Sequence, residues 1–357
     1  MGRISYSQLR LYGECGKKYE YSYKIGLREK TKSGALLFGT AFDKAIEAVL
    51  KNKEIDENEV FDKIWTHQEI NKKETYLPES LMVVYAASDF DYDLLQEDDV
   101  RLLKVKCQEF LGSEDWYEKY EECVQAKKQR AYKLFTEQQN KYLNICNWLS
   151  LRRKGHLMLK TNRLKVLPFI TEIHDTQVKI ELANADGDSL LGYADLVCTW
   201  NDGRKCIIDY KTSASEYEED SVITSPQLSL YAYGLGIKTA GYFVFKKGII
   251  KNRIKICSIC GFDGSGARHK TCSSEVDGRR CGGEWKETVR PEADVQILIN
   301  DIPEKTMAVV MENVDMVNKA IKAEIFPRNF DSCRKPWGLC PYYDLCFKGD
   351  DSDLIKI

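Results

Sequence analysis

One hairpin pattern constrains the fold of this chain more than any other feature. Residues 192–211 contain two mostly apolar runs on either side of the tripeptide Asn201-Asp202-Gly203. This tripeptide suits a three-residue hairpin loop, a type I turn with Gly203 in the left-handed conformation. Such a loop pairs Trp200 with Arg204, so the pattern predicts two adjacent antiparallel strands.

Three charged residues meet at the open end of this predicted hairpin. Counting back from the loop places Asp195 opposite Asp209, and cross-strand partners share a face. Period-2 alternation puts Lys211 on the same face. Two carboxylates beside an ammonium group make a site for a hard cation such as Mg²⁺, which takes oxygen ligands and bridges to a substrate phosphate. Lys211 then orients or deprotonates an attacking water, or stabilises the charge that builds on the phosphorus.

A surface hairpin with two ordinary acids and a salt-bridging lysine is the alternative, because short motifs have many chance matches. Two observations favour an active site. Asp209 directly follows the apolar run Cys206-Ile207-Ile208, where an unpaired carboxylate is costly to bury. Downstream, Gln227 and Tyr231 lie four residues apart on a predicted helix, so they share a face and can hold a phosphate or the lysine.

Helical patterns dominate the chain up to residue 165, and strand patterns follow. Ser5-Tyr6-Ser7 caps a first helix that carries Cys15 and Tyr19, and a second helix is expected from Phe38. The charged stretch 54–165 indicates further helices, whose basic end is either a solvated face or a surface that follows phosphates. The other expected elements are strands over 178–182, 190–199, 205–211, 241–245 and 294–299, and helices over 225–235 and 303–326.

The chain of 357 residues has 13 cysteines and a formal net charge of −2. No apolar run approaches the ~20 residues of a membrane span, and the polar start does not match a signal peptide. We therefore expect a soluble protein in the reducing cytoplasm. There an odd cysteine count argues for metal or cluster ligands rather than a disulfide scaffold. The near-neutral net charge leaves the binding of nucleic acid to local basic patches.

Four cysteines within 25 residues predict a structural zinc knuckle, because thiolates at this spacing are typical ligands of Zn²⁺. Glycines follow two of the ligands, and His269 either replaces one thiolate or is a bystander. Nine Lys and Arg residues from Lys246 to Arg280 surround the site, and they either solubilise the segment or contact the DNA backbone. The ligands of this knuckle are Cys257, Cys260, Cys272 and Cys281.

A second cysteine set, the tail set, combines three cysteines near the C-terminus with one near the N-terminus. Four thiolates suit a [4Fe–4S] cluster or Zn²⁺, and the spacing alone does not separate these from free cysteines in a packed tail. Its members are Cys15, Cys333, Cys340 and Cys346. The five remaining cysteines lie in apolar patterns and are expected in the core: Cys107, Cys123, Cys146, Cys198 and Cys206.

These features resemble the PD-(D/E)XK nuclease superfamily, and within it the RecB-like and CRISPR-adaptation exonuclease branch, which includes many phage exonucleases. The resemblance covers residues 1–50 and 170–350. Its motifs follow the order of the branch: Ser7-Gln-Leu with Cys15 and Tyr19, Gly39-Thr-Ala-Phe-Asp43, Gly192-Tyr-Ala-Asp195, Ile208-Asp209-Tyr-Lys211, Gln227-Leu-Ser-Leu-Tyr231, and Cys340-Pro-Tyr-Tyr-Asp-Leu-Cys346.

The resemblance implies roles for individual residues. Asp195 and Asp209 are expected to bind Mg²⁺ or Mn²⁺, and Lys211 is expected to be the catalytic lysine. Gln227 and Tyr231 are expected to position the DNA and the site. The tail set is expected to hold a [4Fe–4S] cluster that ties the two chain ends together. The gap between Cys333 and Cys340 is wider than the two residues common in the branch.

Asp43 departs from the branch, which has histidine at this position. A carboxylate can still ligate Mg²⁺ or Mn²⁺ while adding negative charge that alters metal preference, and an exposed helix acid is the alternative. The branch also has a further acid before Gly192. Glu172 is the first candidate for that acid and Glu181 the second.

The expected architecture is an α/β, restriction-endonuclease-like core: a mixed central sheet flanked by helices, with a helical insertion, an inserted zinc knuckle and a C-terminal iron–sulfur staple. The expected segments are the N-terminal helices 1–53, the helical insertion 54–165, the catalytic core 166–248, the knuckle 249–288, and the C-terminal strand, helix and tail 289–357.

The function implied by the resemblance is metal-dependent hydrolysis of DNA phosphodiesters by an exonuclease that acts on single-stranded or duplex ends. Its expected cofactors are Mg²⁺ or Mn²⁺, a [4Fe–4S] cluster and Zn²⁺. A role in recombination, repair or phage genome processing, with recombination or replication proteins as partners, rests on analogy. A non-catalytic DNA-binding subunit that uses the cluster and the knuckle is the alternative, and the intact set of Asp195, Asp209 and Lys211 argues against it.

Overall fold

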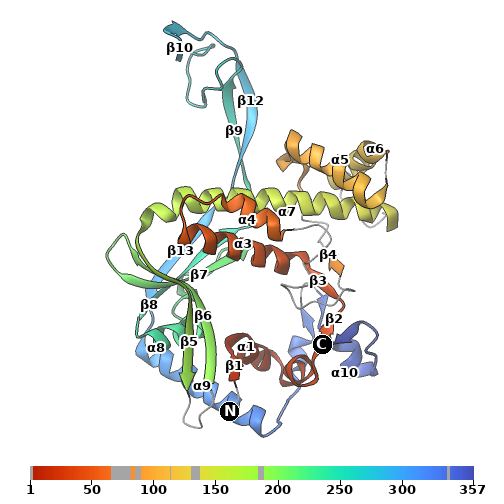
Figure 1. Cartoon of the computed structure of the whole chain (residues 1–357), viewed down its shortest axis with the longest axis vertical. Helices are drawn as coiled ribbons and strands as arrows, with labels where there is room; N and C mark the ends of the chain where they lie inside the picture. Colours follow the sequence, from red (N-terminus) through yellow and green to blue (C-terminus); the bar gives the residue numbers. More distant parts are fainter. Residues whose placement is uncertain are drawn as a thin grey trace.

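The chain folds around one mixed β-sheet that has helices on both faces, and an arm extends away from this body (Figure 1). This computed structural model describes residues 3–65, 82–84, 90–112, 114–129, 137–183, 189–335 and 338–357. Among these residues, no helix has both the length and the apolar character needed to cross a membrane.

The central sheet contains the strands β1 Arg3–Ser5, β5 Ile170–Ala183, β6 Ser189–Trp200, β7 Lys205–Ser213, β8 Thr239–Lys246 and β13 Val295–Asp301. Their order is β1-β6-β7-β8-β13, and β5 pairs with β6 beside this path. The strands β5, β6 and β7 are antiparallel neighbours, whereas β7 and β8 run parallel. The prediction of a mixed central sheet is therefore confirmed.

The hairpin of β6 and β7 has the register that the sequence predicts. Leu196 pairs with Ile208, and the backbone N–H of Trp200 donates a hydrogen bond of 2.9 Å to the carbonyl of Arg204. Gly203 has φ 85°, the left-handed conformation expected in the loop. Strand β5 is longer than the predicted strand 178–182. It pairs with β6 from Ile170 to Ala183 through two register shifts, and many of its residues are exposed, so they show no apolar strand pattern.

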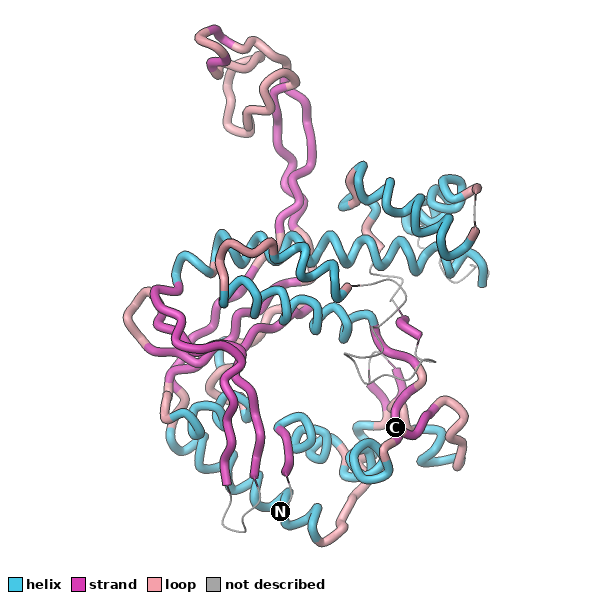
Figure 2. Tube along the Cα trace, in the orientation of Figure 1, coloured by secondary structure: helices cyan, strands magenta, loops and turns pink. Residues whose placement is uncertain are grey.

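Helices cover both faces of the sheet (Figure 2). On one face, α3, α4 and α7 share a hydrophobic cluster with the sheet, in which the rings of Phe42 and Phe245 lie 5.0 Å apart. On the other face, α8 and α9 contribute Leu228 and Val314 to a second cluster. The helix bounds are α1 Tyr6–Glu14, α2 Gly16–Tyr19, α3 Gly34–Lys51, α4 Glu57–Ile64, α5 Glu97–Leu111, α6 Trp116–Gln129, α7 Glu137–Lys165, α8 Pro226–Leu235, α9 Glu304–Lys322 and α10 Tyr343–Lys348.

The first helix is shorter than predicted. Ser5 caps α1 through a capping box with Gln8, but α1 ends at Glu14. Cys15, which was predicted within the helix, has an extended backbone with φ −168°. A β-carbon on Gly16 would lie 2.6 Å from Pro327, so the break lets the C-terminal segment pack closely against the N-terminal helices.

The segment 54–165 packs on the same core as the sheet, since Phe61 of α4 and Leu103 of α5 belong to the cluster that contains Phe245. The five segments named above stay a prediction as domains. The five cysteines expected in the core are buried, which confirms that expectation: Cys107, Cys123, Cys146, Cys198 and Cys206.

Acidic neighbours occupy much of the basic end of α7. Arg152 forms ion pairs with Asp62 and Asp99, and Arg163 forms one with Glu57. An arginine that is already paired inside the protein has less charge to offer a phosphate. These contacts therefore favour a structural role for this stretch over a surface that follows phosphates.

The arm consists of residues 250–292. Strands β9 Ile250–Cys257 and β12 Trp285–Glu292 form a two-stranded antiparallel ribbon, and the short strands β10 Glu275–Val276 and β11 Arg279–Arg280 lie at its tip (Figure 1). The ribbon was not predicted: β9 alternates over Ile254-Lys255-Ile256, but its partner β12 shows no such alternation, and most residues of both strands are exposed or half-buried.

Strand pairing also joins the two chain ends. The strand β2 Leu27–Glu29 pairs antiparallel with β16 Leu354–Lys356. Two further short pairs are β3 Thr31–Ser33 with β4 Met82–Val84, and β14 Arg334–Lys335 with β15 Gly338–Leu339.

Candidate active site

Asp209 lies at the centre of the candidate site, on β7, and is only 2% exposed. Its Oδ2 atom lies 2.5 Å from Nζ of Lys211. Its Oδ1 atom accepts a hydrogen bond of 2.8 Å from Nε2 of Gln227. The buried carboxylate is thus paired at both oxygens, and the alternation along β7 brings Lys211 to the same face.

Helix α8 delivers two further side chains to this centre. Ser225 caps the helix, and Gln227 and Tyr231 follow on one face. The Nε2 atom of Gln227 lies 3.0 Å from the hydroxyl of Tyr231, and its Oε1 atom accepts a hydrogen bond of 3.3 Å from Nζ of Lys211. A β-carbon at Gly192 would lie 2.7 Å from the Tyr231 ring, so glycine is needed there for the ring to fit.

Asp195 is held by the backbone of β7. The ladder of β6 and β7 ends at Leu196 and Ile208. One residue beyond it, Oδ2 of Asp195 accepts a hydrogen bond of 2.9 Å from the backbone N–H of Tyr210. The other oxygen accepts one of 3.3 Å from Nε2 of Gln177 on β5. The Asp195 carboxylate therefore accepts a backbone hydrogen bond of the kind that a strand carbonyl accepts within the ladder, and this contact keeps Asp195 close to Asp209.

Helix α3 brings Asp43 to the same site. Loss of hydration and then the charge of Asp209 raise the pKa of Asp43 to about 7, although Lys211 and Lys44 lower it. The side chain nevertheless remains accessible to solvent. Asp43 thus lines the open side of the site, where it is both reachable from outside and influenced by the other carboxylates.

The three carboxylates resist full ionisation together. Burial, followed by the charges of Asp209 and Asp43, raises the pKa of Asp195 to about 8, and the N–H of Tyr210 opposes this. Burial also raises the pKa of Asp209, and Lys211 opposes it. A divalent cation would stabilise the ionised forms of all three groups. This cluster of carboxylate oxygens therefore fits a hard divalent cation such as Mg²⁺ or Mn²⁺.

The further acid expected before Gly192 is not supplied by either candidate in the described structure. Glu172 pairs with Thr199 along the ladder and its carboxylate faces His174. Glu181 lies opposite Leu191, and its Oε2 atom is 2.6 Å from Nζ of Lys179. The residue that β5 brings to the site is Gln177. Only the register of β5 against β6 identifies Gln177 as a neighbour of Asp195, and the sequence pattern did not reveal that register.

Helix α1 contributes a residue that the sequence singled out only as part of a cap. Burial raises the pKa of Tyr6, while Arg10 and Lys211 lower it and Asp209 raises it further. Tyr6 also packs against the hydrophobic cluster that contains Tyr242, the strand partner of Asp209 on β8. The hydroxyl of Tyr6 is therefore within electrostatic reach of the site.

The four predicted knuckle cysteines converge at the tip of the arm. Their Sγ atoms all lie within 4.8 Å of one another. The Cys257 and Cys281 sulfurs are 3.5 Å apart, and the Cys260 and Cys272 sulfurs are 3.7 Å apart. A tetrahedral zinc ion with Zn–S bonds of about 2.3 Å places its thiolates roughly 3.8 Å apart, so this set fits a single ion. His269 is not part of the group.

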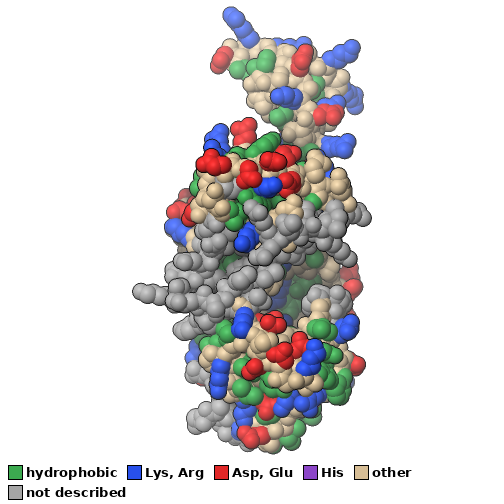
Figure 3. Space-filling model, turned by 90° about the vertical axis from the view of Figure 1, so that its right-hand side faces the viewer, with side chains coloured by type: hydrophobic (Ala, Val, Ile, Leu, Met, Phe, Trp, Pro, Cys, Tyr) green, Lys and Arg blue, Asp and Glu red, His purple; other side chains and the backbone are tan. Residues whose placement is uncertain are grey.

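Local backbone geometry supports this arrangement. Gly261 and Gly282, the glycines that follow the ligands, have φ 69° and 68°, a left-handed conformation that suits tight turns. A β-carbon on Gly283 would clash with the Cys257 sulfur. The tip itself, residues 257–285, carries four Lys or Arg and four Asp or Glu residues, and both signs are visible on it in Figure 3. This balance favours solubilising charge over a phosphate-binding tip.

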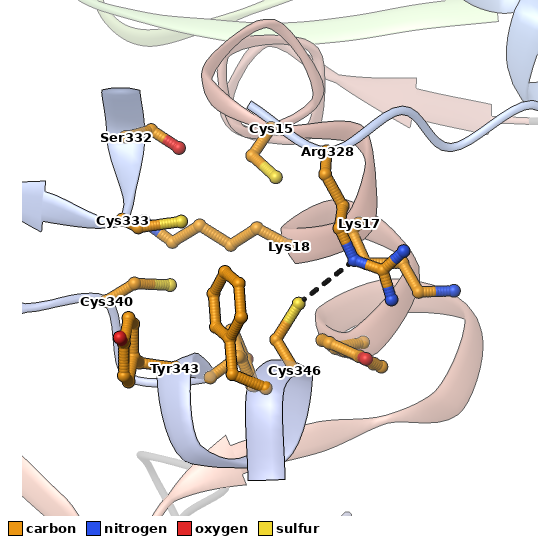
Figure 4. A pocket seen from close by; sticks show the side chains of 12 residues that line it. Cys15, Lys17, Lys18, Arg328, Ser332, Cys333, Cys340, Tyr343 and Cys346 are labelled. Atoms are coloured by element: carbon orange, nitrogen blue, oxygen red, sulfur yellow. Dashed lines mark hydrogen bonds between the residues drawn. The ribbon is translucent and has the colours of Figure 1, made fainter. Parts of the chain in front are cut away.

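The tail set lines one small pocket between the two chain ends, and its sulfurs point into a common space (Figure 4). The six residues between Cys333 and Cys340 do not move the two cysteines apart, because β14 and β15 pair antiparallel within this gap. The backbone N–H of Cys340 then donates a hydrogen bond of 2.8 Å to the carbonyl of Cys333.

The tail sulfurs are spaced more widely than those of the knuckle, since within the described chain only the knuckle forms a group as tight as 4.8 Å. Two of them accept hydrogen bonds: Cys15 from the Asn329 N–H at 3.4 Å, and Cys346 from Nε of Arg328 at 3.2 Å. The four thiols of the tail set are therefore gathered around one pocket without being as tightly grouped as those of the knuckle.

A comparison with protein families gives one match. The model of the PD-(D/E)XK nuclease superfamily matches residues 3–347, which include all the carboxylates and cysteines described above. A search of the curated proteins finds no match for the chain.

Proposed function

The chain belongs to the PD-(D/E)XK nuclease superfamily, which indicates metal-dependent nuclease activity, and we propose that it is a Mg²⁺- or Mn²⁺-dependent exonuclease that degrades DNA from its ends. The observation that carries the proposal is the buried network of Asp209, Lys211 and Gln227 beside Asp195 and Asp43. The preference for an exonuclease rests on the branch that the motifs resemble.

Three residues would hold the metal: Asp195, Asp209 and Asp43. A bound Mg²⁺ or Mn²⁺ supplies Lewis acidity toward the phosphate and lowers the pKa of a coordinated water. The protein contributes the positions of the oxygens. Asp195 is fixed by a backbone N–H and Asp209 by Gln227, so neither needs to reorganise when the metal arrives.

Lys211 acts in this proposal as a cation. Burial alone would lower its pKa, but Asp209 and then Asp195 outweigh burial, and its pKa is raised. A lysine that keeps its proton stabilises the negative charge developing on the transferred phosphoryl group. Of the roles that the sequence left open, this electrostatic role fits the structure better than removal of a proton from water.

Gln227 and Tyr231 would orient Lys211 and the substrate phosphate. Gln227 links Asp209, Lys211 and Tyr231 through hydrogen bonds of 2.8 to 3.3 Å. A change at Gln227 would therefore disturb several partners at once.

We further propose Zn²⁺ at the knuckle and a [4Fe–4S] cluster at the tail set, both with structural roles. The spacing of the sulfurs supports this division, as described above. We also propose a cytoplasmic location, that of the bacterial host if a phage encodes the chain, because thiolate ligands require a reducing compartment. A role in DNA recombination, repair or phage genome processing, with recombination or replication proteins as partners, follows the branch resemblance.

The test is digestion of linear, end-labelled DNA and of covalently closed circular DNA with Mg²⁺ or Mn²⁺. We expect the linear substrate to be shortened from its ends and the circle to stay intact. Cleavage of the circle would instead identify an endonuclease. Binding of DNA without any cleavage would support the alternative of a non-catalytic DNA-binding subunit.

A further inference from the structure

Gln177 differs from its neighbours in the central sheet by its backbone. It has φ 52°, a left-handed conformation that is costly for a residue with a β-carbon. It nevertheless lies within β5, where Thr176 and Val178 pair with Leu196 and Ala194 of β6. The other described non-glycine residues with positive φ lie outside this sheet, and they are Asp277 and Glu324.

This backbone conformation has a consequence at Asp195. The strand pairs on either side of Gln177 bring it opposite Asp195, and its Nε2 atom donates a hydrogen bond of 3.3 Å to Oδ1 of Asp195. The N–H of Tyr210 holds Oδ2 at 2.9 Å. Asp195 is thus held at both oxygens, while each oxygen keeps a lone pair for another partner.

We propose that Gln177 is a positioning residue whose left-handed backbone aims its amide at Asp195 and fixes that carboxylate for a divalent cation. This inference rests on the proposed function. An amide holds the carboxylate without adding a fourth negative charge to a site where three carboxylates already repel one another. Backbone strain that persists beside such a site is expected where it serves ligand geometry.

The test measures Mn²⁺ binding to the protein without DNA, by isothermal titration calorimetry. Gln177→Met keeps the side-chain length and the strained backbone but removes the amide. Gln177→Gly removes the amide and also relieves the strain. Partners that orient a metal ligand typically affect affinity by 10- to 100-fold, so we expect both variants to weaken Mn²⁺ binding by about 10-fold.

The melting temperature separates this role from a merely structural one. Gln177→Gly should melt at or slightly above the wild-type temperature, because glycine adopts φ 52° without strain. Weaker Mn²⁺ binding in a protein that is no less stable would support a positioning role. Unchanged Mn²⁺ affinity in both variants would overturn it.

Two controls keep the inference distinct from the proposed function. Asp277→Gly relieves a left-handed residue at the tip of the arm and should leave Mn²⁺ affinity unchanged. Asp195→Ala should abolish or strongly weaken Mn²⁺ binding. If Asp195→Ala binds Mn²⁺ like the wild type, the proposed metal site fails. If only the Gln177 variants bind normally, the inference about Gln177 fails alone.

Discussion

The carboxylate site and the knuckle assemble their ligands in opposite ways. Asp195 and Asp209 come from the two strands of one hairpin, whereas Asp43 comes from helix α3, which lies far earlier in the chain, and packing of α3 on the central sheet brings the three together. The knuckle gathers four thiols from 25 consecutive residues at the tip of an exposed ribbon. One site is built by the hydrophobic core, and the other lies on a segment that contributes nothing to the two core clusters.

This difference indicates what each metal does for the protein. The core positions the carboxylates without help, and burial, followed by the charge of Asp209, raises the pKa of Asp195 and of Asp43, so their ionised forms are unfavourable there. The arm has no comparable apolar cluster, so a zinc ion bound there would itself supply folding energy. Loss of the first metal should therefore stop the chemistry and spare the fold, whereas loss of the second should loosen the arm and spare the chemistry.

Lys211→Met is expected to have the largest effect on cleavage. Removing a preorganised positive charge should slow DNA hydrolysis by about 10³-fold, measured as the initial rate on end-labelled DNA at saturating Mg²⁺. Mn²⁺ should still raise the melting temperature of the variant, because the three carboxylates remain. A variant that cleaves at the wild-type rate would contradict the role of Lys211.

Cys346→Ala tests the tail set, whose four cysteines come from distant segments of the chain and line one pocket. The anaerobically purified wild-type protein should show an absorbance band at about 400 nm that the variant lacks. The variant should also lose several kcal/mol in its free energy of unfolding. Cys123→Ala, at a buried core cysteine, should keep the band. Zinc alone in elemental analysis of the wild type would contradict a cluster.

Cys260→Ala tests the knuckle directly. The variant should lose one equivalent of zinc and show faster amide hydrogen exchange in residues 250–292, while β7 and β8 exchange as in the wild type. Its cleavage rate should fall far less than that of Lys211→Met. Equal loss of cleavage in the two variants would show instead that the arm and the core are coupled.

The smallest expected effect concerns Gly39, one helical turn before Asp43 on α3. A β-carbon there would meet no other atom within 4 Å, so Gly39→Ala should raise stability by about 1 kcal/mol through helix propensity. We expect a modest loss of cleavage if DNA passes along this face. Gly13→Ala, at an equally open position of α1, should gain stability without losing cleavage.

The sequence predicted those features that depend on local chemistry. The turn at Gly203 and the strand register that follows from it are confirmed, because turn type sets register in a short hairpin. The PD-(D/E)XK superfamily is confirmed as well, whereas the branch within it stays a prediction. Helical spacing predicted that Gln227 and Tyr231 share one face of a helix, and in the structure both lie beside Asp209.

The features that were missed depend on pairing between distant segments. Gln177 reaches Asp195 only through the long ladder of β5 and β6, which exposed residues do not mark in the sequence. The break at Cys15 follows from the close approach of Pro327, more than 300 residues away. The ribbon of the arm buries little of either face, and only β9 of its two strands carries a short period-2 pattern.

The most direct test of the central claim compares Asp209→Asn with Asp202→Asn on end-labelled linear DNA with Mg²⁺ or Mn²⁺. Asp202 lies in the exposed loop of the same hairpin and contacts only Arg204 among its described side-chain partners. Asp209→Asn keeps the shape of the side chain and an acceptor for Gln227, but it removes the charge. We predict that Asp209→Asn abolishes cleavage and that Asp202→Asn cleaves like the wild type. Wild-type cleavage by Asp209→Asn would contradict the assignment of the active site.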